Sequence, residues 1–185
     1  MTNALFEVKT EQLLDAAQRL AAALGSARIP YRIVGGFATY LIVDSVAPLE
    51  ARLTRDIDVA VNRLDLDRIA EAVRPFGFAY RHAAGIDMLV DAAAPSARSA
   101  VHLIFAGEKV RREYVESVPF SQAVEMKGLL LAPVVDLVHM KLTSFRLKDK
   151  VHIQDMDKVG LITPEIEATL SPILRERLAE VRATE

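Results

Sequence analysis

The sequence predicts an α+β fold in which strands and helices are mixed through residue 132 and only helices follow. The chain has 185 residues, of which 51% are apolar and 26% charged, as expected of a globular protein with a substantial core. Before residue 132, short β-branched runs alternate with segments of helical periodicity, whereas beyond Pro133 the apolar residues recur at helical spacing. We therefore expect one domain over residues 1–185, with an α/β core over about 28–132 and a helical part over 133–185.

The elements of the core are predicted from capping residues, turns and alternation. Thr10 is a suitable N-cap for a helix over about 10–24, which Gly25 would end. A strand at 31–34 runs into Gly35-Gly36, and a helix over about 37–43 follows directly. The other expected elements are a helix over 64–73, strands at 56–61, 78–81, 88–90 and 101–105, and a hairpin that pairs 124–126 with 129–131.

The helical part begins at a proline. Pro133 opens a helix that we expect to reach about residue 147, and a shorter helix is expected over 152–159. Two further helices are expected after Thr163-Pro164 and Ser171-Pro172, because each pair places a capping side chain directly before a proline.

Charge and cysteine content exclude several classes of protein. With 23 basic and 25 acidic residues the formal net charge is −2, which argues against a dedicated nucleic-acid or membrane-surface binder but is compatible with a local basic groove. The absence of cysteine excludes disulfides, thiolate zinc sites, iron–sulfur clusters and cysteine nucleophiles. A metal would have to be held by carboxylates, imidazoles or phosphates.

The sequence shows no targeting or membrane signal. The first nine residues do not combine a basic segment with an apolar one, and the longest uncharged apolar run, over 129–135, is far too short to span a bilayer. We therefore expect a cytoplasmic protein without a membrane partner.

The first candidate site feature is Gly35-Gly36, between a predicted strand and a predicted helix. Glycines at such a junction let the backbone approach a ligand closely, and a helix N-terminus favours phosphate. A plain tight turn is an equally good interpretation. The third glycine of a dinucleotide-binding fingerprint is absent.

The second feature is a pair of carboxylates, Asp56 and Asp58, on one predicted strand. Residues two apart on a strand point to the same face, with Cα atoms roughly 6.5–7 Å apart. Two carboxylates on one face repel each other unless a cation lies between them, and hard divalent ions prefer oxygen ligands. A divalent metal site is favoured over two solvated acids, because aspartate is depleted in strands.

The third feature is Lys141, which interrupts an apolar row on the helix that begins at Pro133. Its ammonium group either reaches back to the surface or points into a cleft to hold a triphosphate. Asp149 and Asp155 lie just beyond it, and either is a candidate to orient the ammonium group.

Two of these motifs together resemble a known family. Gly35-Gly36 and the run Thr54-Arg55-Asp56-Ile57-Asp58 resemble the G-G/S … D-x-D signature of the polymerase-β-like nucleotidyltransferase superfamily. The run over 136–155, Asp-Leu-Val-His-Met-Lys-Leu through Arg-Leu-Lys-Asp to Asp, resembles the corresponding stretch of its minimal and AbiE-type toxin branches. The resemblance covers about residues 28–162.

The resemblance implies a nucleotidyltransferase fold, a short mixed sheet flanked by helices. It also implies transfer of a nucleoside monophosphate from an NTP to a hydroxyl, with Mg²⁺ or Mn²⁺ held by Asp56 and Asp58 and catalysis completed by His102 and Lys141. The nucleotide-binding residues that it implies are Gly35, Gly36, Thr54, Arg55, Lys141, Asp149 and Asp155. RNA, a protein or a small antibiotic would each fit as acceptor, and a toxin of this type would have a cognate antitoxin.

One position departs from the family pattern. The third carboxylate of the family lies mid-strand in a sequence such as V-D-L-I-F, and the matching segment here has His102 at that position. Three interpretations follow: His102 acts as the base that readies the hydroxyl, Asp91 or Glu108 substitutes, or the site is degenerate. In the last case the domain binds a nucleotide or a protein partner without catalysis. A half-buried histidine without a role is also compatible with the sequence.

Overall fold

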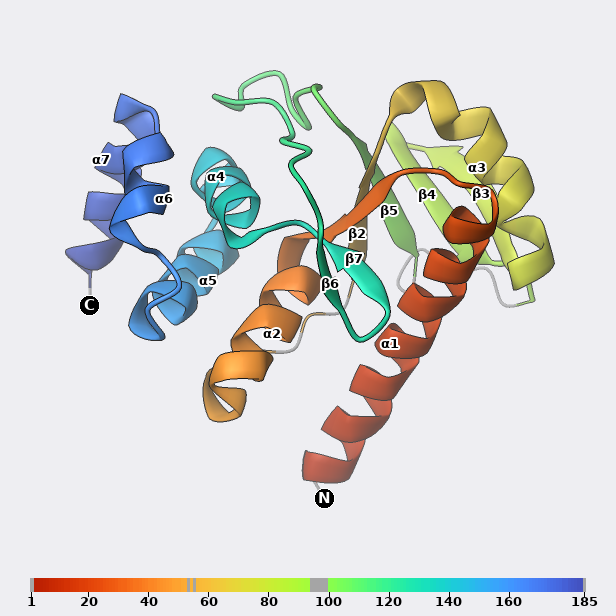
Figure 1. Cartoon of the computed structure of the whole chain (residues 1–185), viewed down its shortest axis with the longest axis horizontal. Coiled ribbons are helices and arrows are strands. Elements are labelled where there is room, and N and C mark those ends of the chain that lie inside the picture. Colours follow the sequence, from red (N-terminus) through yellow and green to blue (C-terminus); the bar gives the residue numbers. More distant parts are fainter. Residues whose placement is uncertain (1, 53, 55, 94–99, 185) are drawn as a thin grey trace.

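The computed structural model describes residues 2–52, 54, 56–93 and 100–184 and contains a mixed seven-stranded sheet with helices packed against it (Figure 1). The strands are β1 (Tyr31–Val34), β2 (Ile57–Val61), β3 (Phe78–Ala83), β4 (Ile86–Asp91), β5 (Val101–Phe105), β6 (Val124–Met126) and β7 (Leu129–Leu131). Their order across the sheet is β3-β4-β5-β2-β1-β7-β6. The predicted α+β class is confirmed.

The centre of the sheet brings the predicted site segments together. β2 pairs antiparallel with β1 and parallel with β5. In this register Asp58 lies opposite Val34 on one side and opposite His102 on the other. Because directly opposed residues point to the same face, the side chains of Asp58 and His102 are neighbours, and Gly35 begins next to them.

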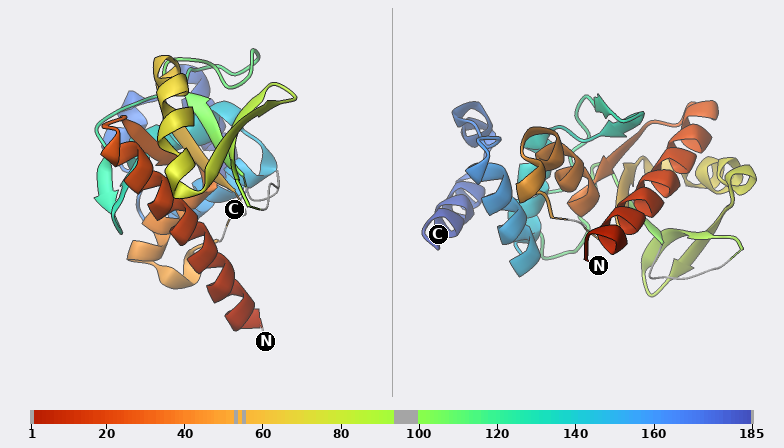
Figure 2. Two further views of the ribbon diagram at one scale, coloured as in Figure 1. Left: turned by 90° about the vertical axis from the view of Figure 1, so that its right-hand side faces the viewer. Right: turned by 90° about the horizontal axis from the view of Figure 1, so that it is seen from below.

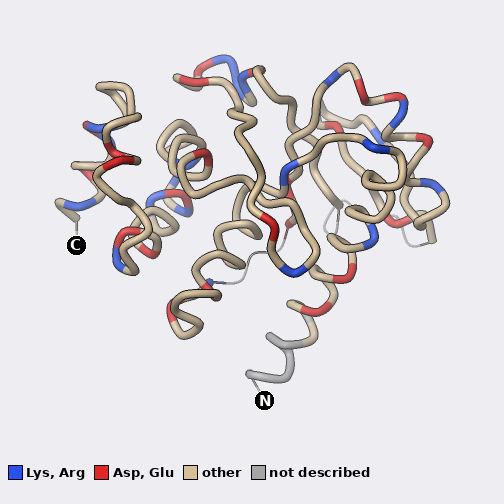
Figure 3. The backbone as a smooth tube through the Cα atoms, viewed as in Figure 1, with Lys and Arg blue, Asp and Glu red and all other residues tan. Residues whose placement is uncertain are grey.

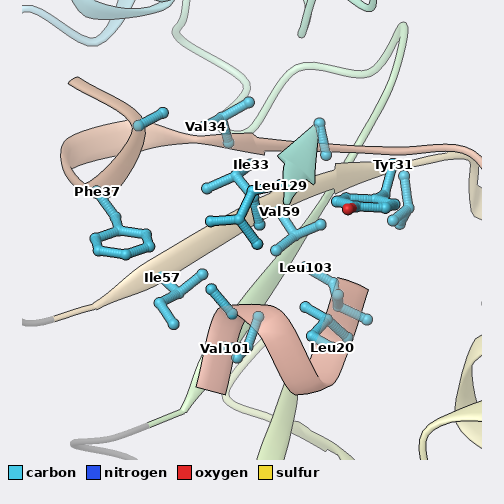
Figure 4. Close-up of a cluster of buried hydrophobic side chains, with 14 of the residues drawn as sticks. Leu20, Tyr31, Ile33, Val34, Phe37, Ile57, Val59, Val101, Leu103 and Leu129 are labelled. Carbon is cyan, nitrogen blue, oxygen red and sulfur yellow. The ribbon is translucent and has the colours of Figure 1, made fainter. Parts of the chain in front are cut away.

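The main core lies between the sheet and α1 (Thr2–Ser26), with α3 (Leu66–Ala72) beside it. Leu20 of α1 packs against the strand residues Ile33, Val59 and Leu103 (Figure 4). All four side chains are buried, and each such side chain removed from water contributes about 1.5–3 kcal/mol to folding. The N-terminal half of α1 projects beyond this core (Figure 2).

Helix α2 (Gly35–Val46) links the sheet to the helical part of the chain. Its residues from Gly36 to Val43 are buried, and it contacts both β2 and the two helices that follow the sheet. Those helices are α4 (Val134–Ser144) and α5 (Leu147–Lys158), and they pack on α7 (Pro172–Arg182), which follows α6 (Pro164–Thr169). A second apolar cluster joins Val43 of α2 to Val138, Leu142, Ile153 and Leu174.

Several predicted boundaries are wrong. α1 begins at Thr2, so Thr10 lies inside the helix and is not its N-cap. The helix predicted over 133–147 ends at Ser144, because Phe145 adopts a left-handed conformation with φ of +50°. α5 then begins at Leu147 rather than 152, since the carboxylate of Asp149 accepts a hydrogen bond from the backbone N–H of Arg146, the residue before the helix. Short 3₁₀ turns at Pro48–Glu50, Arg63–Asp65 and Arg74–Phe76 complete the described elements.

None of the helices over the described residues combines the length and apolarity needed to cross a membrane.

Candidate active site

A cavity of about 600 Å³ opens where β1, β2 and β5 meet the helices α4 and α5. Its lining includes Gly35, Gly36, Thr54, Asp56, Asp58, His102, Lys141 and Asp149. These residues come from segments far apart in the sequence, so the fold brings together most of the residues that the motifs single out.

The glycine turn forms one wall of the cavity and is closely packed. Gly35 has a φ of +68°, and a Cβ atom at this position would overlap the carboxylate of Asp58. At Gly36 a Cβ atom would lie 2.8 Å from Oγ1 of Thr54 and 3.4 Å from Cε1 of His152. Both positions therefore require glycine for space, and Gly35 also requires it for its backbone conformation.

Asp58 lies against this turn, and Asp56 lines the same cavity. Asp56 and Asp58 are both half-buried, and Oδ1 of Asp58 lies 3.3 Å from Nδ1 of His102. The Asp58 carboxylate raises the pKa of His102 above its usual value, and the partial burial of the ring opposes this rise. With Nδ1 donating to Asp58, Nε2 is the imidazole nitrogen left to accept a proton.

The lysine reaches the cavity as a buried charge. Lys141 is 5% exposed, and its Nζ donates to Oδ1 of Asp149 at 3.4 Å. Burial lowers the pKa of Lys141, and the charge of Asp149 opposes this effect. The alternative that Lys141 reaches the outer surface is therefore wrong.

Asp149 contacts several side chains at this end of the cavity. Its carboxylate accepts hydrogen bonds from Ser144 Oγ at 2.8 Å and from Arg146 Nε at 2.7 Å. Burial alone would raise its pKa, but these hydrogen bonds and the charge of Lys141 hold the pKa of Asp149 below its usual value. Asp149 is the counterion of the lysine.

Two of the predicted nucleotide-binding residues are not placed at the cavity. Asp155 pairs with Arg52, whose Nε lies 2.9 Å from Oδ2, and it is not among the described residues that line the cavity. Arg55 lies outside the described residues. The two acids considered as substitutes for the third carboxylate also have other partners: Glu108 binds Arg63, and Asp91 accepts from the backbone N–H of Ala93.

Sequence reasoning missed other parts of the lining. His152 lies against the glycine turn, and its Nδ1 is buried with no hydrogen-bond partner among the described residues. Burial lowers the pKa of His152 to about 4, so the ring is neutral at physiological pH. A loop over 107–118 forms the opposite wall of the cavity. His152 could have been found from its spacing three residues after Asp149, whereas the loop has no periodicity that predicts its position.

The donor set limits how a metal can bind. Within the described residues there is no group of three or more His, Asp or Glu side chains arranged to hold a metal ion. Asp56 and Asp58 are a set of two carboxylates, and Mg²⁺ is commonly held by one or two carboxylates together with substrate phosphates and water. The pair therefore fits a cation that is shared with a bound triphosphate.

Solved structures share this architecture. An antigenic nucleotidyltransferase-like protein from Paracoccidioides brasiliensis superposes with a TM-score of 0.60, at 17% identity, over 95% of this chain and 89% of that one. The chain has the nucleotidyltransferase fold. The antibiotic-resistance factor ANT(2″)-Ia matches with a TM-score of 0.55, at 12% identity, over 95% of this chain and 91% of that one.

A viral enzyme matches over part of its length. The Megavirus polyadenylate synthase has a TM-score of 0.55 and 9% identity, and the match covers 88% of this chain and 36% of the viral one. No family model and no curated protein matches the sequence. At these identities the likeness establishes the fold, and the activity must be argued from the site.

Proposed function

We propose that this nucleotidyltransferase-fold chain is a metal-dependent enzyme that transfers a nucleoside monophosphate from an NTP to a hydroxyl. The observation that carries the proposal is that Asp56, Asp58 and the buried Lys141 line the same cavity as the Gly35-Gly36 turn. An acidic pair suited to a divalent cation, next to an ammonium group and a helix N-terminus, is suited to a triphosphate.

The phosphates would bind at the glycine turn. Without side chains at Gly35 and Gly36, a phosphate can approach the backbone N–H groups at the start of α2, where the helix dipole favours negative charge. Lys141 adds a positive charge, and Asp149 fixes the position of its ammonium group. Thr54 lies against Gly36 and would hold the glycine turn in position.

Asp56 and Asp58 would hold Mg²⁺ or Mn²⁺. When bound, such a cation neutralises the charge that develops on the phosphate oxygens. Asp58 supplies a hard oxygen ligand from β2, where the sheet register places it opposite Val34 and so next to the glycine turn. Asp56, directly before the first residue of β2, supplies a second ligand to the same cavity.

His102 would ready the acceptor. The hydroxyl oxygen attacks the α-phosphorus, the bond from that phosphorus to the bridging oxygen breaks, and pyrophosphate leaves. The hydroxyl proton passes to Nε2 of His102, while Nδ1 stays bonded to Asp58. Positioning and charge neutralisation supply most of the rate enhancement in reactions of this kind.

A second candidate keeps the fold without the reaction. His102 stands where the family has a carboxylate, and the described cavity offers two aligned acids rather than three. These observations favour a degenerate domain that binds a nucleotide or a protein partner. The narrower assignment to an AbiE-type toxin with an antitoxin partner rests on the sequence resemblance over 136–155 alone, and the cytoplasmic location rests on the expectation from the sequence that there is no targeting signal.

Label transfer separates the two candidates. The protein is incubated with each α-labelled NTP, Mg²⁺ or Mn²⁺, and cellular RNA or protein, beside the Asp58→Ala variant. The proposal predicts label transfer by the wild type and none by the variant. Transfer that survives Asp58→Ala contradicts it, and nucleotide binding without any transfer supports the degenerate domain.

A further inference from the structure

The acidic side chains that line the cavity differ in whether other residues of the protein donate hydrogen bonds to them. Glu108 accepts two hydrogen bonds from Arg63, at 2.6 and 2.7 Å. Glu116 accepts a hydrogen bond from Ser171 Oγ at 2.8 Å and lies 2.7 Å from Nδ1 of His139. Neither carboxylate is available to a cationic ligand without loss of these contacts.

The same holds for the next two acids. Asp87 accepts from Tyr80 at 2.6 Å and lies 2.8 Å from Nδ1 of His82. Asp149 is bonded to Lys141 and Arg146, as described above. The acids that remain are Asp56 and Asp58, which the proposed function assigns to the metal.

Several basic side chains that line the cavity, in contrast, have no close acidic partner within the described part of the chain. Lys109 and Lys148 line the cavity, are exposed, and have no ion-pair partner among the residues that the structure describes. Arg111 also lines it, and its Nη1 lies 3.9 Å from the exposed Glu113. With a divalent cation at the acidic pair, the uncompensated charge around the cavity is therefore positive.

The loop over 107–118 presents part of this charge from a fixed position. It arches over the top of the molecule in Figure 1, and basic and acidic positions both lie along it in Figure 3. One end is held by the Arg63–Glu108 pair and the other by Glu116, which binds α4 through His139. Between these two anchors, the half-buried ring of Tyr114 lines the cavity, 6.0 Å from the guanidinium group of Arg111.

From this arrangement we propose that the acceptor is the hydroxyl end of a single-stranded nucleic acid. Lys109 and Arg111 would contact its phosphates and Tyr114 would stack on a base, the combination by which proteins bind single strands. The inference rests on the proposed function: the terminal 3′ hydroxyl attacks the α-phosphorus, a phosphodiester forms, pyrophosphate leaves, and the proton passes to His102. A polycationic antibiotic would find no carboxylate in the described cavity lining, outside the metal pair, that lacks an internal hydrogen-bond partner.

Binding of labelled oligonucleotides tests this inference without relying on catalysis. A fluorescein-labelled 12-mer RNA and the DNA of the same sequence are titrated with the whole protein, and anisotropy is followed over a range of salt concentrations. We expect binding that weakens with salt, and a slope of log K against log salt that is smaller by about 1.4 in the Lys109→Gln/Arg111→Gln variant, from two lost phosphate contacts. Tyr114→Leu should weaken binding about tenfold, the effect of one lost base stack. The RNA and DNA arms show which strand is bound.

Arg112→Gln is the matched control, because Arg112 is an exposed neighbour of Arg111 that is absent from the lining of the cavity. The inference is overturned if Arg112→Gln weakens binding as much as the double variant, if neither strand binds, or if label transfer occurs to a protein and not to a nucleic acid. A calorimetric titration with a non-hydrolysable NTP and Mg²⁺ keeps the two proposals distinct. The double variant should retain wild-type NTP affinity, and an NTP that fails to bind the wild type would refute the proposed function alone.

Discussion

Individual residues of the site are constrained by contacts that a substitution would break in a specific way. Gly35 is the sharpest case, because it combines a positive φ with a position directly against Asp58. Gly128 has a similar φ of +74° but has no heavy atom within 4 Å of an added Cβ. An alanine at Gly128 would therefore strain the backbone alone, whereas an alanine at Gly35 would strain the backbone and also displace Asp58.

We predict that Gly35→Ala abolishes binding of a Mg²⁺–NTP complex, whereas Gly128→Ala does not. Each substitution should lower the free energy of unfolding by about 1–2 kcal/mol for the left-handed backbone, and Gly35→Ala should lower it further because Asp58 must move. Urea denaturation and calorimetric titration measure the two effects. Equal behaviour of the two variants would show that the contact with Asp58 has no role.

The proposed role of His102 as a base implies that the transfer rate depends on pH. Without a metal, the Asp58 carboxylate raises the pKa of His102 above the ordinary histidine value of 6.5, and an NMR titration of the metal-free protein checks this shift. A divalent cation bound to Asp58 would oppose the rise. Because a protonated ring cannot act as a base, we predict that the transfer rate rises with pH as the imidazolium loses its proton, and that this rise is absent in His102→Ala. The variant should transfer more slowly with nearly unchanged NTP affinity. A parallel loss of affinity would instead make His102 a binding ligand.

At the scale of elements, the junction between α4 and α5 places the buried charges. The left-handed Phe145 ends α4. Asp149 in the first turn of α5 accepts hydrogen bonds from the backbone and side chain of Arg146, and it faces Lys141 from this next helix. A lysine buried in this way is not needed for folding, because an apolar side chain would pack there without desolvating a charge. We propose that Lys141 is present at this position to hold the phosphates of the ligand.

We predict opposite effects on stability for the two partners. Lys141→Met should leave the free energy of unfolding within about 1 kcal/mol of wild type while NTP affinity falls, because Asp149 keeps Arg146 as a counterion. Asp149→Asn should lower the free energy of unfolding by about 3 kcal/mol, because the ammonium group of Lys141 remains buried without a negative partner. Chemical denaturation beside nucleotide titration measures both. If Lys141→Met were the less stable variant, the lysine would have a structural role.

The elements also show what could be predicted from the sequence. Strand Val101–Phe105 and the hairpin of β6 and β7 were predicted to the residue, because alternation and turn residues are local signals. The break at Phe145 could not be predicted, since a phenylalanine rarely adopts a positive φ and here does so because the contacts of Asp149 stabilise the junction. The early start of α1 could not be predicted, because a threonine before an apolar helical row is a suitable N-cap in the sequence even when it lies inside a longer helix.

At the scale of the whole molecule, the fold assembles one cavity from distant segments. The motif residues Gly35, Asp58 and Lys141 could be assigned to a site from the sequence, but their neighbours could not. Lys109, Arg111 and Tyr114 reach the cavity from a loop whose ends are held by the pairs Arg63–Glu108 and His139–Glu116 and by backbone hydrogen bonds of Val118. The net charge of −2 is likewise compatible with a basic wall, because most acids of the cavity are hydrogen-bonded to internal partners.

The central claim is that the acidic pair and the glycine turn bind a metal–triphosphate complex. Calorimetric titration of a non-hydrolysable NTP with Mg²⁺ into the wild type, Asp56→Asn, Asp58→Asn and the control Asp65→Asn tests it most directly. Asp65 is a suitable control because its carboxylate pairs with Arg68 at the start of α3. We predict Mg²⁺-dependent binding to the wild type and to Asp65→Asn, and at least a tenfold loss for each variant of the pair, equivalent to about 1.4 kcal/mol. Binding that is independent of Mg²⁺, or unchanged in Asp56→Asn and Asp58→Asn, would contradict the account.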